Sequence, residues 1–341
     1  MKMNVVIVGS GIAALKTYTT AYNRKNIDTL IVDINPIGGL LASIGLIYKY
    51  PIAPIFIDQD AVTLFHNCNF TCHPIEVHIL KEGNILDKVK GFAPFDVQRL
   101  WLYELAKKKI ACFSLQLYEC ILKMLNLNAG TIRRVHDSIR KIDVVNQIVT
   151  TSQGFILKYE NLIYTWPLDL LIKTITNMKS SSMLTLLNSV TARLKYVSIY
   201  IRSYIIYERI PEEKEQKLKL YFHGTRASRV HTIIKIPMGK YKALLYALTS
   251  YSEYYPLLPG IGDKIHSELR KHRIITSSTQ VLDYNDVNVV YGFLNILPRE
   301  VLKEVCEELR KHNIVLFGRV AEWKEYDVPS LLFKGLPQNT I

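Results

Sequence analysis

Three small residues near the start of the chain have the types and spacing that a dinucleotide phosphate requires. Gly9, Gly11 and Ala14 follow an apolar, strand-like run and open a segment with helical spacing. Gly9 permits a tight turn, Gly11 lets backbone amides approach a pyrophosphate at the helix N-terminus, and Ala14 keeps the helix close to the sheet. A second apolar run ends at Asp33, whose carboxylate would accept hydrogen bonds from an adenosine ribose. Together they predict a dinucleotide site.

Two further glycine positions are predicted to continue this site. Gly38 and Gly39 lie in a turn shortly after Asp33, where they can bring the backbone close to a ligand lying along the first helix. Far along the chain, Gly318 and Arg319 follow a final apolar run, and we expect this glycine to face the first glycine turn. The Arg319 guanidinium offers a charged, planar donor set to a phosphate, although arginines after strands are also ordinary surface residues.

A stretch rich in histidine and cysteine, residues 66–78, contains side chains that zinc accepts. Its cysteines, Cys68 and Cys72, are separated by three residues, and the sequence has no matching second pair. We therefore expect buried thiols in an ordinary loop, and we predict no metal site.

Two basic segments could contact phosphate, but each has a simpler explanation. Arg226, Arg229 and His231 are close in sequence, and a strand there would place Arg229 and His231 on one face, near a substrate diphosphate. Residues 258–264 resemble the glycine hairpin of helix-hairpin-helix DNA-binding modules, where backbone amides hold a phosphate. Solvated charges explain the first segment, and a turn before a helix explains the second.

The composition predicts a self-sufficient globular protein in the cytoplasm. The chain has 341 residues, 49% of them hydrophobic, which is enough for a large core without metals or disulfides. Five cysteines without framework spacing favour a reducing compartment, although hyperthermophile cytosols tolerate disulfides. We expect neither a signal peptide nor a membrane span. The net charge of +13 favours anionic ligands without choosing among nucleotides, nucleic acid and acidic membranes.

The periodicity of the first half predicts an α/β protein with an insertion. Residues 60–137 are predicted to be mostly helical rather than sheet, with an amphipathic run over 95–109. From residue 138 the apolar period changes to two, which predicts a small meander that returns to the core sheet before residue 165. A helix should begin at Pro167, and the polar stretch 177–182 predicts the crossing into a second lobe.

The second half is predicted to begin as sheet and to end with alternating helices and strands. Residues 195–236 alternate in strand fashion around a charged turn at 211–217, which is typical of a sheet with exposed edges or one solvent-facing side. The later predicted elements are helices over 262–272 and 298–311 and strands over 288–291 and 314–317.

Three blocks of the sequence together resemble the group of FAD-dependent amine oxidases, protoporphyrinogen oxidases and UDP-galactopyranose mutases. The first block is the glycine fingerprint with its acid and its later glycine pair. The second, residues 159–168, is similar to the family's strand leading into a threonine-proline crossover, here Thr165 and Pro167. The third, residues 317–326, is similar to the family's closing glycine-arginine block beside an aromatic residue.

This resemblance implies a FAD-binding, Rossmann-like three-layer domain with an inserted mixed α+β substrate lobe. The FAD-binding domain would be discontinuous, comprising 1–57, 138–176 and 290–341, and the substrate or insert lobe would comprise 58–137 and 177–289. The backbone of the strand around Ile139 would be offered to the adenine. The implied cofactor-binding residues are Gly9, Ser10, Gly11, Ala13, Ala14, Asp33, Gly38, Gly39, Leu40, Ile139, Thr165, Gly318 and Arg319.

The region expected beside the flavin ring departs from the family. Relatives carry an acid and a glycine that let the ring pass close to the backbone, whereas this chain has the bulky, proline-containing stretch 45–57. The usual asparagine, methionine and acid after the closing aromatic are also missing. Tyr48, Tyr50 and Trp323 are candidate neighbours of the ring, although packing is the commoner role of aromatic residues. No catalytic residue is assigned.

Several functions remain open at this stage. The leading one is a FAD-dependent oxidoreductase of the amine oxidase-like group, acting on an unidentified small molecule. The alternatives are a catalytically degenerate flavoprotein-fold subunit that binds or scaffolds, and an isomerase similar to UDP-galactopyranose mutase. A nucleic-acid-binding protein is the least favoured. A protein partner or a homo-oligomer is compatible with each.

Overall fold

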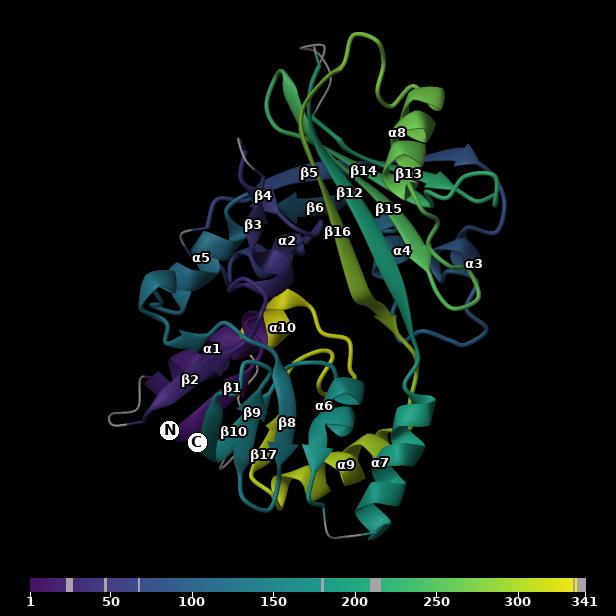
Figure 1. The fold of residues 1–341 in the computed structure, drawn as a ribbon. Coiled ribbons are helices and arrows are strands. Elements are labelled where there is room, and N and C mark those ends of the chain that lie inside the picture. Colours follow the sequence, from purple (N-terminus) through teal and green to yellow (C-terminus); the bar gives the residue numbers. More distant parts are fainter. Residues whose placement is uncertain are drawn as a thin grey trace. The chain divides into compact units, whose positions relative to one another are not determined.

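The chain folds into two units, each assembled from segments that are distant in the sequence (Figure 1). The computed structural model describes residues 1–22, 27–45, 48–66, 68–178, 181–208, 216–333 and 335. Unit 1 comprises Met1–Ala42, Tyr118–Lys195 and Ile296–Ile341, and unit 2 comprises Ser43–Leu117 and Tyr196–Asn295.

An eight-stranded sheet forms the centre of unit 1. Its strands are β1 (Lys2–Val8), β2 (Thr29–Val32), β7 (Arg134–Val135), β8 (Ile139–Asp143), β9 (Ile148–Thr151), β10 (Ile156–Tyr164), β11 (Ile175–Thr176) and β17 (Ile314–Leu316). Parallel pairing gives the order β7-β2-β1-β10-β17. The antiparallel meander β8-β9-β10 extends the sheet, and β11 adds to β8.

The helices of unit 1 bury the faces of this sheet. Val5, Val6, Ile7 and Val8 of β1 are all buried, as expected for a parallel strand covered on both sides. Helix α1 contacts β1, β2 and α10, while α9 contacts β17 and α7. The helices are α1 (Ile12–Tyr22), α5 (Leu117–Met124), α6 (Leu168–Thr174), α7 (Ser181–Arg193), α9 (Arg299–Arg310) and α10 (Val328–Phe333), with short 3-10 turns η1 (Gly39–Leu41) and η2 (Ala129–Thr131).

A seven-stranded, mostly antiparallel sheet forms the centre of unit 2. Its strands are β5 (Thr71–Lys81), β6 (Ile110–Phe113), β12 (Tyr196–Tyr207), β13 (Leu218–His223), β14 (Thr232–Pro237), β15 (Lys242–Tyr251) and β16 (Gln280–Leu294), in the order β16-β12-β15-β14-β13-β5-β6. Only the β5–β13 pair is parallel among the strand pairs of this sheet in the described residues. A separate hairpin joins β3 (Ser43–Ile44) to β4 (Tyr50–Pro51).

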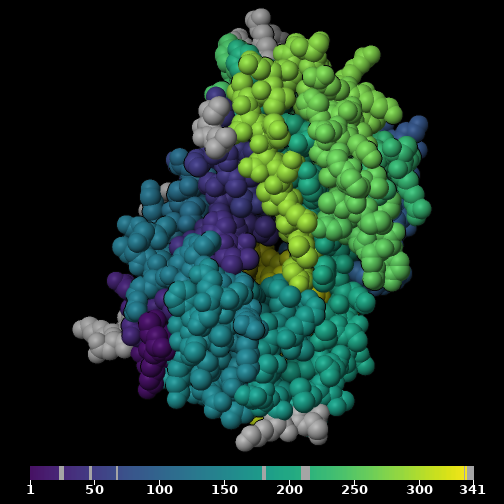
Figure 2. All heavy atoms as spheres, viewed as in Figure 1, coloured from purple at the N-terminus to yellow at the C-terminus, as the bar shows by residue number. Residues whose placement is uncertain are grey.

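The central strands of the unit 2 sheet are packed on both faces. Along β15, Leu244 and Tyr246 join a cluster with α4, while the alternating Ala243 and Leu245 join a cluster with α8. Of the two expected alternatives, the exposed edge is the one observed at β16, which lies on the face shown in Figure 2 and has exposed residues at alternate positions up to Val290. The helices of this unit are α2 (Gln59–Val62), α3 (Ile85–Val89), α4 (Trp101–Ala106) and α8 (Ile261–Lys271).

Most elements predicted after residue 138 are confirmed. The meander, the helix after Pro167, the strands within 195–236 and the closing helix and strand are present with similar bounds. The predicted strand over 288–291 is part of the longer β16, and α7 continues unit 1 to Lys195 beyond the predicted crossing at 177–182. Residues 179–180 of that crossing and 211–215 of the charged turn lie outside the described residues.

The prediction that 60–137 is mostly helical is wrong. β5 and β6 belong to the unit 2 sheet, and β7 belongs to the unit 1 sheet. Within the predicted run 95–109, only α4 is helical in the described structure. The strand β5 carries polar residues and a proline, so its local pattern is weak, and its pairing with the apolar β13 and with β6 decides its conformation.

The prediction of buried free thiols near residue 72 is also wrong. Cys72 and Cys112 oppose each other across β5 and β6 and form a disulfide. Strand register brings the two sulfurs together, which sequence spacing does not reveal. Among the described residues, no group of three or more His, Cys, Asp and Glu side chains could hold a metal ion. No described helix combines the length and apolar character needed to cross a membrane.

Candidate functional site

The carboxyl ends of the five parallel strands of unit 1 gather most of the predicted site residues at one edge. Gly9 follows β1, Asp33 follows β2, Thr165 follows β10, and Gly318 lies two residues after β17. In open α/β sheets, ligands bind outside this edge, where loops and helix N-termini converge. Residues from four separate segments of the chain therefore lie at the same edge of the sheet.

The turn at Gly9 accepts only glycine. Its φ of 113° is unfavourable for other residues, and an added Cβ would lie 2.0 Å from the Thr165 Oγ1 atom. Thr165 is held there because its amide and hydroxyl both donate to the Val8 carbonyl, at 2.9 and 2.8 Å. The Gly9 amide donates to the Val32 carbonyl at 3.0 Å. The end of β1 is therefore bonded to both neighbouring strands, to β2 through the Gly9 amide and to β10 through the Val8 carbonyl.

Gly11 differs from Gly9 because its side-chain direction is open. A Cβ added at Gly11 would meet no heavy atom within 4 Å. The residue directly precedes α1, whose first turn carries no acidic side chain. The N-terminal amides of a helix attract anions, and an acid in the first turn would oppose one. The geometry leaves room for a phosphate at this helix end.

Asp33 is held in place by a small polar network. Its side chain is 3% exposed, and its Oδ2 atom accepts a hydrogen bond from the Ser10 hydroxyl at 2.7 Å. The Oδ1 atom accepts from the backbone and side-chain nitrogens of Asn35, at 2.9 and 3.0 Å. A carboxylate can accept about four hydrogen bonds, so one acceptor position remains for a ligand hydroxyl.

The glycine pair lies directly against the first glycine turn. The Gly38 amide donates to the Ser10 carbonyl at 2.8 Å, and its φ is 106°. A Cβ on Gly39 would lie 3.2 Å from the Gly11 Cα atom. Leu40, the next residue, is 43% exposed. The pair thus narrows the space beside Gly11 with backbone alone.

Gly318 also faces the start of α1, as expected. Its φ is 104°, and an added Cβ would lie 2.7 Å from the Ala13 Cβ atom. Arg319 forms a two-bond ion pair with Glu325, at 2.6 and 2.7 Å. This pairing orients the guanidinium and neutralises much of its charge, which lowers its attraction for a phosphate.

Ile139 begins β8, four residues after the end of β7, and this strand pairs with β9 and β11 rather than with β2. The strand beside Asp33 is instead β7, whose Val135 carbonyl accepts a hydrogen bond from the Asp33 amide at 3.2 Å. β7 has two residues, so no periodic signal marks it, and only its parallel pairing with β2 reveals it.

The candidate ring neighbours are packed side chains in the described structure. Tyr50 is fully buried in the core of unit 2 and accepts a hydrogen bond from the Ser203 hydroxyl at 3.2 Å, and burial raises its pKa. The Tyr48 ring lies 4.5 Å from the Lys242 ammonium. Trp323 in unit 1 is 1% exposed. Residues 46–47, within the bulky stretch 45–57, lie outside the described residues.

The basic segment that contains Arg226, Arg229 and His231 does not present Arg229 and His231 together. His231 is fully buried, where its ring nitrogens bond the Thr232 and Ser250 hydroxyls at 2.8 and 2.9 Å, and burial lowers its pKa. Arg229 lies before β14 with its guanidinium over the Tyr255 ring. The expected shared face is therefore not formed.

Comparison with known proteins identifies the fold without a sequence relative. No protein-family model matches the sequence, and no curated protein matches it significantly. The chain shares its fold with UDP-galactopyranose mutase. The structure of the reduced mutase matches with a TM-score of 0.75 and 14% identity, covering 96% of this chain and 93% of that chain.

Two further solved structures match over nearly the whole chain. A CLA-producing fatty acid isomerase from P. acnes gives a TM-score of 0.65 at 10% identity, with 97% of this chain and 96% of that chain covered. The PF1083 protein from Pyrococcus furiosus gives 0.53 at 10% identity, with 97% and 95% covered. These matches support a mixed α/β fold with a parallel sheet and include one protein type of the group that the motifs resemble.

Proposed function

We propose that this protein is a FAD-binding flavoprotein whose unit 1 holds the adenosine diphosphate part of the cofactor in a Rossmann-like arrangement. The observation that carries the proposal is the open space in front of Gly11 at the N-terminus of α1, with Gly39 close to the Gly11 backbone. A diphosphate needs close backbone approach and oriented amides, and both are provided there. The residues present therefore fit this part of FAD.

Each residue around this space has a proposed role. The turn 9–14 binds the pyrophosphate, and Asp33 accepts a ribose hydroxyl with its remaining lone pair. Gly318 lets the closing loop approach Ala13. Val135, rather than Ile139, is the proposed backbone neighbour of the adenine, because β7 is the strand next to β2 on the side away from β1.

The proposed activity is that of an amine oxidase-like oxidoreductase acting on a small molecule. Bound FAD would supply the redox chemistry, and this chain would bind and orient both molecules. An isomerase is the second candidate, because a mutase and an isomerase are among the structures with this fold. The two activities differ in whether the substrate undergoes a net oxidation.

The absorbance spectrum of the purified protein, before and after incubation with FAD and desalting, tests the cofactor proposal. We expect visible flavin bands in the wild type and none in Gly11→Val, with the fold retained because the first added carbon meets nothing within 4 Å. Gly130→Val is the matched control, since Gly130 lies in the same unit, is exposed and has no positive φ. Wild-type flavin content in Gly11→Val contradicts the placement, and absent binding in the wild type contradicts the cofactor.

Turnover separates the two activities. Hydrogen peroxide release during aerobic incubation with a panel of amines supports the oxidoreductase, since oxygen then accepts the substrate electrons. Conversion of UDP-galactopyranose by the reduced protein without net oxidation supports the isomerase instead. If a flavin-loaded protein does neither, the binding or scaffold alternative gains support.

A further inference from the structure

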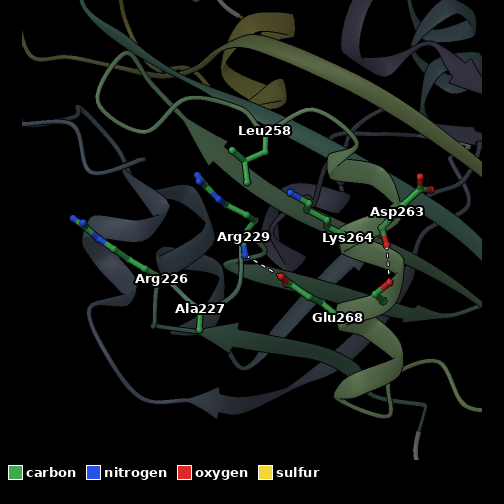
Figure 3. A pocket seen from close by; sticks show the side chains of 8 residues that line it. Arg226, Ala227, Arg229, Leu258, Asp263, Lys264 and Glu268 are labelled. Atoms are coloured by element: carbon green, nitrogen blue, oxygen red, sulfur yellow. Dashed lines mark hydrogen bonds between the residues drawn. The ribbon is translucent and has the colours of Figure 1, made fainter.

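Unit 2 contains a hollow between the loop before β14 and the first half of α8 (Figure 3). Its volume is about 540 Å³. The lining residues are Arg226, Ala227, Arg229, Leu258, Asp263, Lys264, Ser267 and Glu268. In Figure 3, the Lys264 side chain extends from α8 toward Arg229, whereas the side chains of Arg229 and Arg226 both point away from the helix.

The cations of the hollow have no carboxylate partners among the described residues. The Arg226 guanidinium lies 4.1 Å from the centre of the Phe92 ring, and the Arg229 guanidinium lies 3.9 Å from that of Tyr255. Stacking orders the planar groups, and the Arg229 Nη1 atom also donates to the Pro256 carbonyl at 3.4 Å. The Tyr255 hydroxyl is buried and forms no hydrogen bond of ordinary geometry in the described structure.

The two acids at the hollow are directed toward other groups. Glu268 accepts a hydrogen bond from the Ser228 hydroxyl and others from the amides of Arg229 and Val230, at 3.1 and 3.4 Å. Asp263 has a fully exposed carboxylate 3.9 Å from Arg202. The balance of charge inside the hollow is therefore positive, which favours an anion.

The start of α8 adds donors to the same hollow. Its N-cap is Gly260, which has a φ of 64° and no side chain with which to cap the helix. The first amides of a helix without a side-chain cap need another acceptor, and an anion is a favourable one. Asp263 and Lys264 both belong to the first turn of this helix. The exposed Asp263 carboxylate, which opposes an anion, lies 3.9 Å from Arg202, and the Lys264 ammonium adds a positive charge at the same helix end.

We propose that this hollow binds a phosphate group of a small phosphorylated molecule. Planar guanidinium edges, an ammonium and helix amides together match the several oxygens of a phosphate better than the two of a carboxylate. The exposed Asp263 at the rim would repel a nucleic-acid backbone running across the opening. The proposal uses unit 2 alone and does not depend on FAD.

Calorimetric titration of the full chain with inorganic pyrophosphate tests the proposal. The titration is made on the Gly11→Val variant as well as the wild type, because pyrophosphate could also enter the proposed cofactor site. We expect the wild type and Gly11→Val both to bind pyrophosphate. Lys264→Gln should weaken this binding by about tenfold, and Arg226→Gln combined with Lys264→Gln should weaken it more, because hydrogen bonds from charged donors are stronger than those from neutral ones. Lys271→Gln, at the exposed other end of α8, removes the same charge and should bind like the wild type.

Three results would overturn the proposal. The first is no binding of pyrophosphate by Gly11→Val at low salt. The second is equal weakening by Lys264→Gln and Lys271→Gln, which would reflect general charge rather than a site. The third is binding of a DNA oligonucleotide, but not pyrophosphate, that the Lys264→Gln change abolishes, which would make the hollow a nucleic-acid contact.

Discussion

The two candidate binding regions of this protein are built by different means. At the edge of the unit 1 sheet, glycines remove side chains so that backbone groups can approach a ligand, and the shape depends on φ angles and close contacts. At the hollow of unit 2, arginine and lysine side chains from separate segments supply the donors. A backbone-built site is therefore destroyed by adding atoms, whereas a side-chain-built site is destroyed by removing charge.

The two units also differ in how well their buried polar groups are stabilised. Asp33 in unit 1 is buried with three hydrogen-bond donors facing its carboxylate. In unit 2, the Lys88 ammonium is 1% exposed and donates to the carbonyls of His223 and Val230, at 2.8 and 2.7 Å. Burial lowers the pKa of Lys88 to about 7, against the smaller opposing effect of Glu268. The fold of unit 2 therefore disfavours the charged form of Lys88.

Gly9→Val should have the largest effect and break the backbone-built region outright. Its side chain would overlap Thr165 and require a φ that valine avoids, so we expect the free energy of unfolding to fall by about 3 kcal/mol or more. Denaturant unfolding followed by circular dichroism measures this. Gly11→Val is the comparison, and equal destabilisation of the two variants would contradict the distinction between a packed and an open glycine.

Lys88→Met should change the pH dependence of stability that arises in unit 2. Between about pH 7 and 10.5 the unfolded chain holds the Lys88 proton while the folded chain has released it, so the wild type gains stability as pH rises. The gain is at most about 1.4 kcal/mol per pH unit. Denaturant midpoints at pH 7 and pH 9.5 should therefore differ more in the wild type than in Lys88→Met. Identical pH slopes would contradict a deprotonated buried lysine.

Gly318→Ala tests the contact between the closing loop and α1. A Cβ there lies 2.7 Å from that of Ala13 at a φ of 104°, so we expect a loss of about 1–3 kcal/mol in stability together with weaker FAD binding. Thermal unfolding with and without FAD measures both effects. Gly154→Ala shares the positive φ but meets nothing within 4 Å, so it isolates the backbone cost from the contact. A Gly318→Ala loss no larger than that of this control would show that the contact is unimportant.

Asp33→Asn should have the smallest effect and sharpen the role of the ribose acceptor. The amide keeps the size of the side chain but removes the charge and places a donor where one oxygen accepts, so we expect FAD affinity to fall by about tenfold. Flavin fluorescence titration measures the change, with circular dichroism as the check on folding. Unchanged affinity would indicate that Asp33 serves only the Ser10 and Asn35 network.

Short-range patterns explain which parts of the fold were predictable. The meander and α9 have clear apolar periods of two and 3.6 residues. The glycine turn is recognisable in the sequence because few residues other than glycine adopt its backbone conformation. β5, β7 and the Cys72 disulfide were missed because each depends on a partner strand far away in sequence. The register between strands is not encoded in either strand alone.

By itself, the sequence determined the glycine turn, the acid after β2, the glycine pair and the closing Gly318, since each requirement is local to a few residues. Only the tertiary structure decided that Val135 rather than Ile139 lies beside Asp33, that Arg319 is paired with Glu325, and that His231 is buried. The physical reason is that a backbone conformation depends on its own residues, whereas a side chain's charge, exposure and neighbours depend on whichever distant segments pack against it.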